Sequence, residues 1–85
     1  MTELSRLTWS DAELALADAR LAIVPVGSLE QHGPHLALDT DLAVAEAMAR
    51  RLDSDLGREA LLCPSIPYGL SEHHMGFPGT LTLRP

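Results

Sequence analysis

Two continuous apolar runs divide the chain, and each predicts a buried β-strand. Residues 21–26 read LAIVPV and residues 60–66 read ALLCPSI. Neither run alternates apolar and polar residues, as a strand with one solvated face would. Each run contains a proline, which cannot donate a ladder hydrogen bond, so we expect the first strand to end or lie near an edge at Pro25. Both runs are typical of strands covered on both faces.

The stretch between these runs predicts an amphipathic helix. Its apolar residues recur at helical spacing and would share one face: Leu42, Ala45, Met48, Ala49 and Leu52. Asp39, Thr40 or Asp41 would serve as the N-cap, and Gly57 would end the helix. The sequence predicts a loop over residues 27–39, between the first strand and this helix.

A shorter helix is predicted over residues 11–19, because Ser10 and Glu13 have the spacing of a capping box. The strand, helix and strand that follow make a βαβ unit, which implies a parallel α/β sheet. Residues 67–83 (PYGLSEHHMGFPGTLTL) form a turn-rich loop, and Arg84-Pro85 would suit the start of another helix.

The number of expected elements is too small to complete such a sheet. Two parallel strands need cover on both faces, and two short helices provide little of it. We therefore expect residues 1–85 to be a single, partial α/β domain, the N-terminal portion of a larger α/β protein. On its own, such a chain would be marginally stable or would need oligomeric partners.

Composition excludes several classes of protein. The formal net charge is −6, with six cationic residues that are all arginine, and aromatic residues make up 4% of the chain. No basic stripe or aromatic platform for nucleic acid is therefore present. Cys63 has no partner for an internal disulfide, the first nine residues lack the apolar core of a signal peptide, and no apolar run approaches the length of a membrane span. A cytoplasmic protein without membrane or nucleic-acid partners is expected.

Candidate chemistry is concentrated in residues 26–41 (VGSLEQHGPHLALDTD), just beyond the first strand. Functional groups of α/β sheets gather past the carboxyl ends of the strands. Glu30 and His32 lie two residues apart, so their side chains would point the same way on extended chain, and Asp41 would return to the same edge at the head of the helix. Carboxylate and imidazole donors suit zinc, manganese or iron(II), so a metal site is one interpretation.

Simpler interpretations of the same residues stay open. Asp39 or Asp41 is equally explained as a helix N-cap. His35 fits a loop residue, or one that supports a ligand, better than a ligand itself. His73 and His74, in the second loop, are explained either as solvated histidines or as groups that orient a substrate or move a proton.

Taken together, GSLEQHGPHLALDTD and YGLSEHHMGFPGTLTL resemble the creatininase (creatinine amidohydrolase) family, in order and separation, from Leu7 onward. The resemblance implies an α/β/α sandwich, two divalent metal ions (zinc, with manganese or iron as alternatives) and a homo-oligomer, a hexamer in the family. By position, Glu30 matches a ligand of the first metal, His32 a ligand of the second, and Asp41 the carboxylate that bridges both. Ser71 lies where the family places a substrate-contacting serine. The remaining ligands of the family, a later histidine and a later glutamate, are not among residues 1–85.

Three hypotheses about function remain open. The first is a metal-dependent amidohydrolase that cleaves a non-peptide C–N bond, often in a cyclic amide, of a small-molecule substrate. The second is a peptidase or deformylase of the same family, acting in cofactor or peptide maturation. The third is a truncated, non-catalytic chain with a structural or interaction role.

Overall fold

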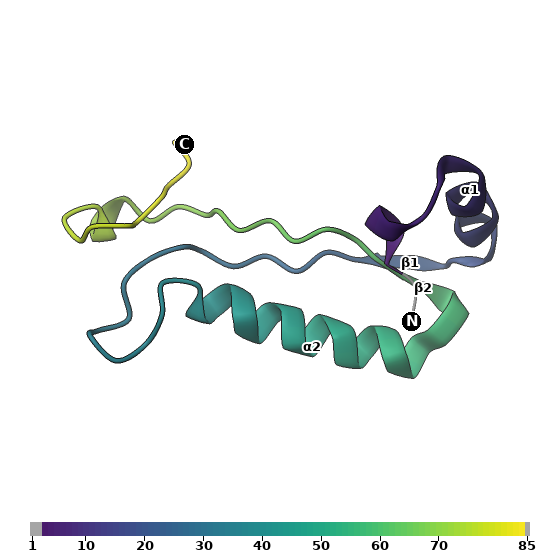
Figure 1. Ribbon diagram of the computed structural model, residues 1–85, viewed down its shortest axis with the longest axis horizontal. Helices are drawn as coiled ribbons and strands as arrows, with labels where there is room; N and C mark the ends of the chain where they lie inside the picture. The colour runs from purple at the N-terminus through teal and green to yellow at the C-terminus, as the bar shows by residue number, and fades with distance from the viewer. Residues whose placement is uncertain (1–2, 85) are drawn as a thin grey trace.

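The structure, a computed structural model, describes residues 3–84. Its regular elements are two α-helices, two short β-strands and three 3-10 turns, arranged along one long direction (Figure 1). In chain order these are η1 (Leu4–Arg6), α1 (Trp9–Asp18), β1 (Leu21–Ile23), α2 (Thr40–Leu56), η2 (Gly57–Glu59), β2 (Ala60–Leu62) and η3 (Glu72–His74). The predicted βαβ unit is confirmed. The prediction that both strands are buried holds only for β2, because α2 packs on β2, while the residues of β1 are exposed or half-buried.

β1 and β2 pair in parallel, with Ala22 opposite Leu61. Regular pairing stops short of the predicted strand ends because Pro25 and Pro64 have no N–H to donate. The two segments nevertheless stay side by side beyond the prolines. The amide of Ile66 donates to the carbonyl of Pro25 over 2.9 Å, and the amide of Gly27 donates to the carbonyl of Ile66 over 3.1 Å. The prolines therefore interrupt the strands without separating them.

Helix α2 connects β1 to β2 and packs against β2. It begins at Thr40, with Asp39 as the N-cap residue, although the Asp39 side chain makes no capping hydrogen bond. It ends at Leu56, because Gly57 has φ +60°, a left-handed conformation that glycine adopts without steric cost. Ala49 and Asp53 form the buried face of the helix. The predicted stop at Gly57 is confirmed.

Helix α1 begins earlier than predicted. Its N-cap is Thr8, whose hydroxyl accepts a hydrogen bond from the amide of Asp11 over 3.3 Å. Ser10, the expected cap, lies inside the helix and its hydroxyl contacts that of Thr8. Thr8 and Ser10 are each followed three residues later by an acidic residue, as in a capping box. Thr8 is the N-cap because its backbone is extended (φ −72°, ψ 163°).

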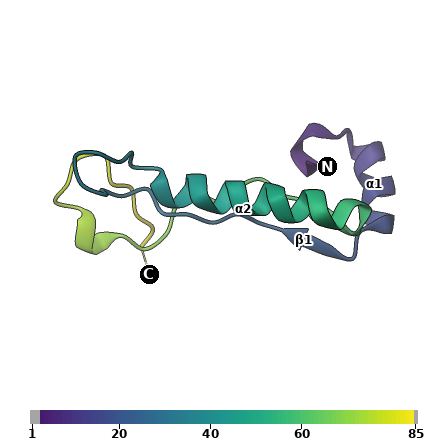
Figure 2. The same ribbon diagram turned by 90° about the horizontal axis from the view of Figure 1, so that it is seen from below.

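The described chain is elongated, with extents of 46 × 25 × 19 Å and a radius of gyration of 15.5 Å. A compact domain of this length would have a radius of gyration of about 12 Å. Figure 2 shows α2 and β1 running along the long axis, with α1 at one end. The buried apolar residues are few: Ala49, Ala60, Leu61 and Leu62. No helix among residues 3–84 is long and apolar enough to cross a membrane.

Candidate metal centre

Two loops meet at the end of the molecule where α2 begins, opposite α1 (Figure 1). The first loop follows β1 and the second follows β2, as expected for the carboxyl edge of a parallel sheet. The amide of Leu81 donates to the carbonyl of Leu29 over 3.1 Å, so the second loop folds back onto the first. The amide of Glu30 donates to the carbonyl of Leu38 over 3.2 Å and closes the first loop. Both bonds use the peptide group between Leu29 and Glu30, so they fix the backbone on the N-terminal side of Glu30.

Glu30, His32 and Asp41 come together at this edge. One donor atom from each lies within 4.8 Å of the others. The side chains of Glu30 and His32 are 15% and 23% exposed, and that of Asp41 is 43% exposed. The loop residues Glu30 and His32 are therefore largely shielded from solvent, whereas the helix residue Asp41 is more accessible to it. The structure therefore brings together the three residues that the sequence singled out.

The nitrogen Nε2 of His32 fits a metal ligand. It is buried, it lies 3.3 Å from Oδ2 of Asp41, and it has no hydrogen-bond partner in the described part of the chain. A buried polar nitrogen without a partner is costly. A divalent cation held by imidazole nitrogen and carboxylate oxygens would satisfy it, and zinc, manganese and iron(II) all accept this donor set.

Asp41 is held at the site by the segment that follows β1. Its Oδ2 accepts a 2.9 Å hydrogen bond from the hydroxyl of Ser28. Next to it, Gly27 lies so close to α2 that an added Cβ would be 2.4 Å from Cα of Leu42. The absence of a side chain at Gly27 therefore lets the strand end approach the helix start. Asp41 is a residue of the first helical turn whose carboxylate faces the site, and the N-cap position belongs to Asp39.

Two residues from the same stretch of sequence lie outside this group of donors. Asp39 and His35 are both exposed, and neither belongs to a donor group found among residues 3–84. Ser28, by contrast, contacts the group although the sequence patterns do not predict it as a site residue. The signal available for it was the pair Gly27-Ser28 directly after the first apolar run, where a small residue permits close approach and a hydroxyl can reach a neighbouring carboxylate.

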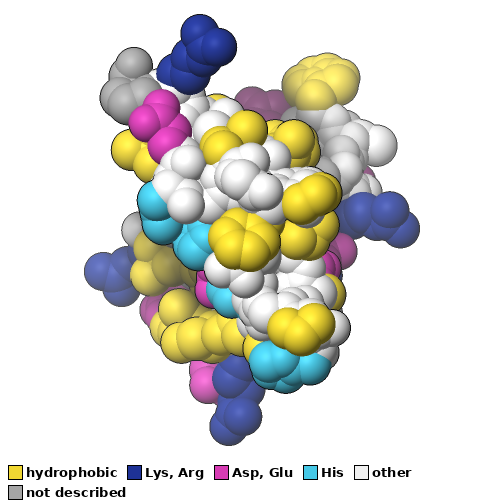
Figure 3. All heavy atoms as spheres, turned by 90° about the vertical axis from the view of Figure 1, so that its left-hand side faces the viewer, with side chains coloured by type: hydrophobic (Ala, Val, Ile, Leu, Met, Phe, Trp, Pro, Cys, Tyr) yellow, Lys and Arg dark blue, Asp and Glu magenta, His cyan; other side chains and the backbone are white. Residues whose placement is uncertain are grey.

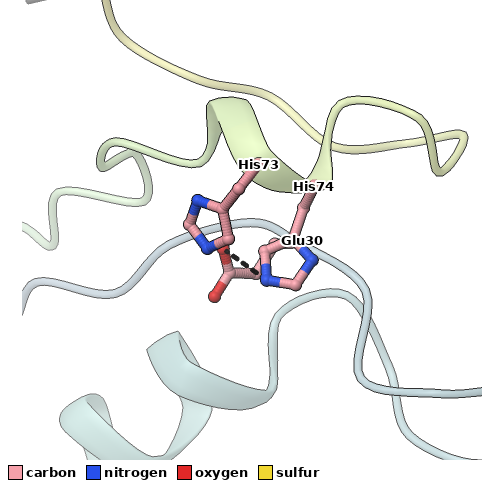
Figure 4. Close-up of side chains that lie close together, drawn as sticks. All are labelled: Glu30, His73 and His74. Carbon is pink, nitrogen blue, oxygen red and sulfur yellow. Dashed lines mark ion pairs between the residues drawn. The ribbon is translucent and has the colours of Figure 1, made fainter.

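Glu30 also belongs to a second donor group, with His73 and His74 (Figure 4). Nε2 of His74 lies 3.7 Å from Oε2 of Glu30, and the two imidazole rings have centroids 4.2 Å apart. His73 is exposed, whereas the His74 side chain is 23% exposed. The space-filling view of this end shows histidine side chains set among hydrophobic ones (Figure 3).

Ser71 is the N-cap residue of η3, the turn that carries these histidines. It is fully buried, its amide donates to the hydroxyl of Thr82 over 2.8 Å, and its carbonyl accepts from the amide of His74 over 2.9 Å. Its own hydroxyl has no hydrogen-bond partner among residues 3–84. The substrate contact expected of Ser71 stays a prediction.

Comparison with known proteins agrees with this arrangement. The family model described as creatinine amidohydrolase matches residues 5–85. The chain is 48% identical over 67 residues to the mycofactocin precursor peptide peptidase of Mycolicibacterium smegmatis, covering 74% of this chain and 27% of the relative. It is 36% identical over 83 residues to the creatinine amidohydrolase of Pseudomonas putida, covering 91% of this chain and 31% of the relative.

A solved creatininase described as the manganese form superimposes with a TM-score of 0.83 at 34% sequence identity, over 98% of this chain and 34% of that one. The chain thus spans about a third or less of the proteins it matches, and it corresponds to them in both sequence and fold. The chain belongs to the creatininase family.

Proposed function

We propose that the whole protein is a divalent-metal-dependent hydrolase of amide C–N bonds, and that Glu30, His32 and Asp41 are the metal ligands of this chain. The observation that carries the proposal is the convergence of these three donors within 4.8 Å. Nε2 of His32 is buried, lies 3.3 Å from Oδ2 of Asp41 and has no hydrogen-bond partner among the described residues. Solved creatininases that resemble the chain include a Zn-Zn form and a manganese form. Both support a divalent metal at this position.

Each residue has a distinct part in the proposal. Glu30 would hold a first metal and His32 a second, and Asp41 would bridge both, since a carboxylate has an oxygen for each. Bound metals supply a water of lowered pKa and polarise the amide carbonyl. The net reaction adds water across the C–N bond and gives a carboxylate and an amine. Ser28 would keep the Asp41 carboxylate turned toward the site, and Ser71 would contact the substrate.

Two classes of amide fit this chemistry. A small cyclic amide is the first, supported by the match to a creatinine amidohydrolase and by a similar creatininase solved with creatine. A peptide is the second, favoured by the higher identity to the precursor peptide peptidase, 48% against 36%. We further propose that the whole protein is a homo-oligomer, in keeping with its membership of the creatininase family, and that it is cytoplasmic, in keeping with the composition of the sequence.

The test uses the whole protein that carries this chain. Metal content is measured by mass spectrometry of the purified protein, and hydrolysis of creatinine and of a peptide panel is followed by liquid chromatography. We expect bound divalent metal and C–N cleavage, both lost in His32→Ala. The matched control is His35→Ala, which removes an exposed imidazole three residues away and should leave both unchanged. Absence of metal and of hydrolysis in the wild-type protein would favour a structural role instead.

A further inference from the structure

Glu30 is contacted by a residue that is not among the proposed ligands. Nε2 of His74 lies 3.7 Å from Oε2 of Glu30. His74 comes from the 3-10 turn η3, far along the sequence from Glu30. Its other nitrogen, Nδ1, lies 3.2 Å from Nε2 of Gln31. One imidazole ring thus connects the side chains of two neighbouring residues, Glu30 and Gln31. Which ring nitrogen carries the proton decides whether the His74 ring donates to Glu30 or to Gln31.

The amide orientation of Gln31 is determined by Gly33. The backbone N–H of Gly33 donates to Oε1 of Gln31 over 2.8 Å, so the atom that faces His74 is the NH₂ nitrogen of Gln31. This geometry depends on Gly33, which has φ +78°. An NH₂ group donates hydrogen bonds only, so Nδ1 of His74 must be the accepting, unprotonated nitrogen.

This assignment fixes the tautomer of His74. In a neutral imidazole with unprotonated Nδ1, the proton is on Nε2, and Nε2 is the atom that faces Oε2 of Glu30. The 3.7 Å separation is too long for a hydrogen bond, so the contact here is electrostatic.

The backbone of His74 is itself well anchored. Its carbonyl accepts from the amide of Phe77 over 3.0 Å and from the hydroxyl of Thr80 over 3.0 Å. Its amide donates to the carbonyl of Ser71 over 2.9 Å. A ring held at this position and fixed in one tautomer presents an N–H donor in a constant direction. A carboxylate ligand oriented by such a donor binds metal more tightly than one that rotates freely.

We propose that Gly33, Gln31 and His74 form a hydrogen-bonded relay that orients the Glu30 carboxylate, with His74 as a positioning residue. The inference rests on the proposed metal function. Oε2 of Glu30 faces the His74 N–H, which leaves the second oxygen available to a metal. His74 is not a ligand in this arrangement, because Nε2 carries the proton and the lone pair of Nδ1 is used by Gln31. The group of Glu30, His73 and His74 is therefore not a separate metal site.

Metal binding by the whole protein provides the first test. Chelator competition gives the metal dissociation constant, and mass spectrometry gives the stoichiometry. We expect His74→Ala to weaken binding about tenfold to a hundredfold with unchanged stoichiometry. His74→Gln, whose amide nitrogen can replace the Nε2–H donor, should recover most of the affinity. The matched control is His35→Ala, which removes an exposed imidazole that belongs to neither donor group and should have no effect.

Nitrogen-15 NMR of the metal-free protein, labelled at histidine, provides the second test. We expect a His74 signal with Nδ1 unprotonated and Nε2 protonated, identified by its loss in His74→Gln. Gln31→Glu keeps the oxygen that accepts from Gly33 but replaces the NH₂ donor with an acceptor, so it should move the proton to Nδ1 and weaken metal binding.

The opposite tautomer in the wild-type protein, or no recovery in His74→Gln, would overturn the relay while the metal function stands. Loss of one metal equivalent in His74→Ala would also overturn it, because His74 would then be a ligand. A wild-type protein that binds no divalent metal would instead reject the proposed function, and with it the role of His74 at a metal ligand. The NMR result separates these cases, since it requires no metal.

Discussion

Ser28 donates a 2.9 Å hydrogen bond to Oδ2 of Asp41, and this bond joins the segment after β1 to the first turn of α2. Asp41 is the most exposed of the three proposed ligands, with 43% of its side chain accessible, so packing alone does little to restrict its rotation. The hydroxyl of Ser28 is therefore the contact that holds this carboxylate toward His32. Its removal tests whether the orientation of Asp41 matters for metal binding.

Ser28→Ala is expected to weaken metal binding by the whole protein about tenfold or more. A hydrogen bond to a charged group contributes roughly 1.5–3 kcal/mol, and 1.4 kcal/mol corresponds to a factor of ten. Chelator competition measures the change. Ser54→Ala, which removes an exposed hydroxyl from α2, is the matched control and should bind metal as the wild type does. Equal affinities in the two variants would show that Ser28 does not orient the ligand.

Asp41→Ala is expected to remove both metal ions, because Asp41 is proposed as a ligand of both. Metal analysis of the purified variant should find less than one equivalent, against two in the wild type if both sites fill. Asp39→Ala removes a carboxylate two residues away that is exposed and makes no capping hydrogen bond, so it should retain the full metal content. Two equivalents retained in Asp41→Ala would refute the bridging role.

Much of this arrangement was predictable from local sequence. The apolar runs at residues 21–26 and 60–66 predicted the positions of both strands, and the prolines in them predicted the interruptions that the structure shows. The predicted burial was right for β2 and wrong for β1. The spacing of Glu30 and His32 predicted that their side chains would lie together, and the position of Asp41 at the helix start predicted its return to the same edge. Membership of the creatininase family was also predicted, from the two loop motifs.

The remaining contacts were not predictable in this way, because they depend on how distant segments meet. His74 reaches Gln31 and Glu30 only because residues 67–83 fold back on the first loop through the bond between Leu81 and Leu29. The start of α1 was missed for a local reason: Thr8 and Ser10 both suit an N-cap, and the backbone conformation at Thr8 decides between them. Ligand roles, oligomeric state and cellular location stay predictions.

Gly27→Ala is expected to destabilise the whole protein by about 1–3 kcal/mol or more, the usual cost of overpacking. An added Cβ would lie 2.4 Å from Cα and 2.5 Å from N of Leu42, and backbone atoms cannot move aside as a flexible side chain can. Chemical denaturation measures the loss. Because relief of the clash would push the start of α2 away from β1, metal affinity should fall as well.

The control for this variant is Gly76→Ala. A Cβ added at Gly76 meets nothing within 4 Å, and its backbone does not require glycine. Its free energy of unfolding should stay within about 0.5 kcal/mol of the wild type, as for most surface substitutions. A Gly27→Ala protein as stable as Gly76→Ala would mean that the strand end and the helix start are not tightly packed in solution.

The isolated 85-residue chain is expected to bind zinc or manganese weakly or not at all. Its described part buries only four apolar residues and leaves large ones such as Trp9 (82% exposed) and Met48 (68%) in solvent, so little hydrophobic free energy opposes the entropy of the unfolded chain. Three protein ligands shared between two metals are also too few for tight coordination. Isothermal titration calorimetry and circular dichroism check both points. A tight stoichiometric site in a cooperatively folded 85-residue chain would contradict the expectation, because the loops would then hold Glu30, His32 and Asp41 in place without further packing.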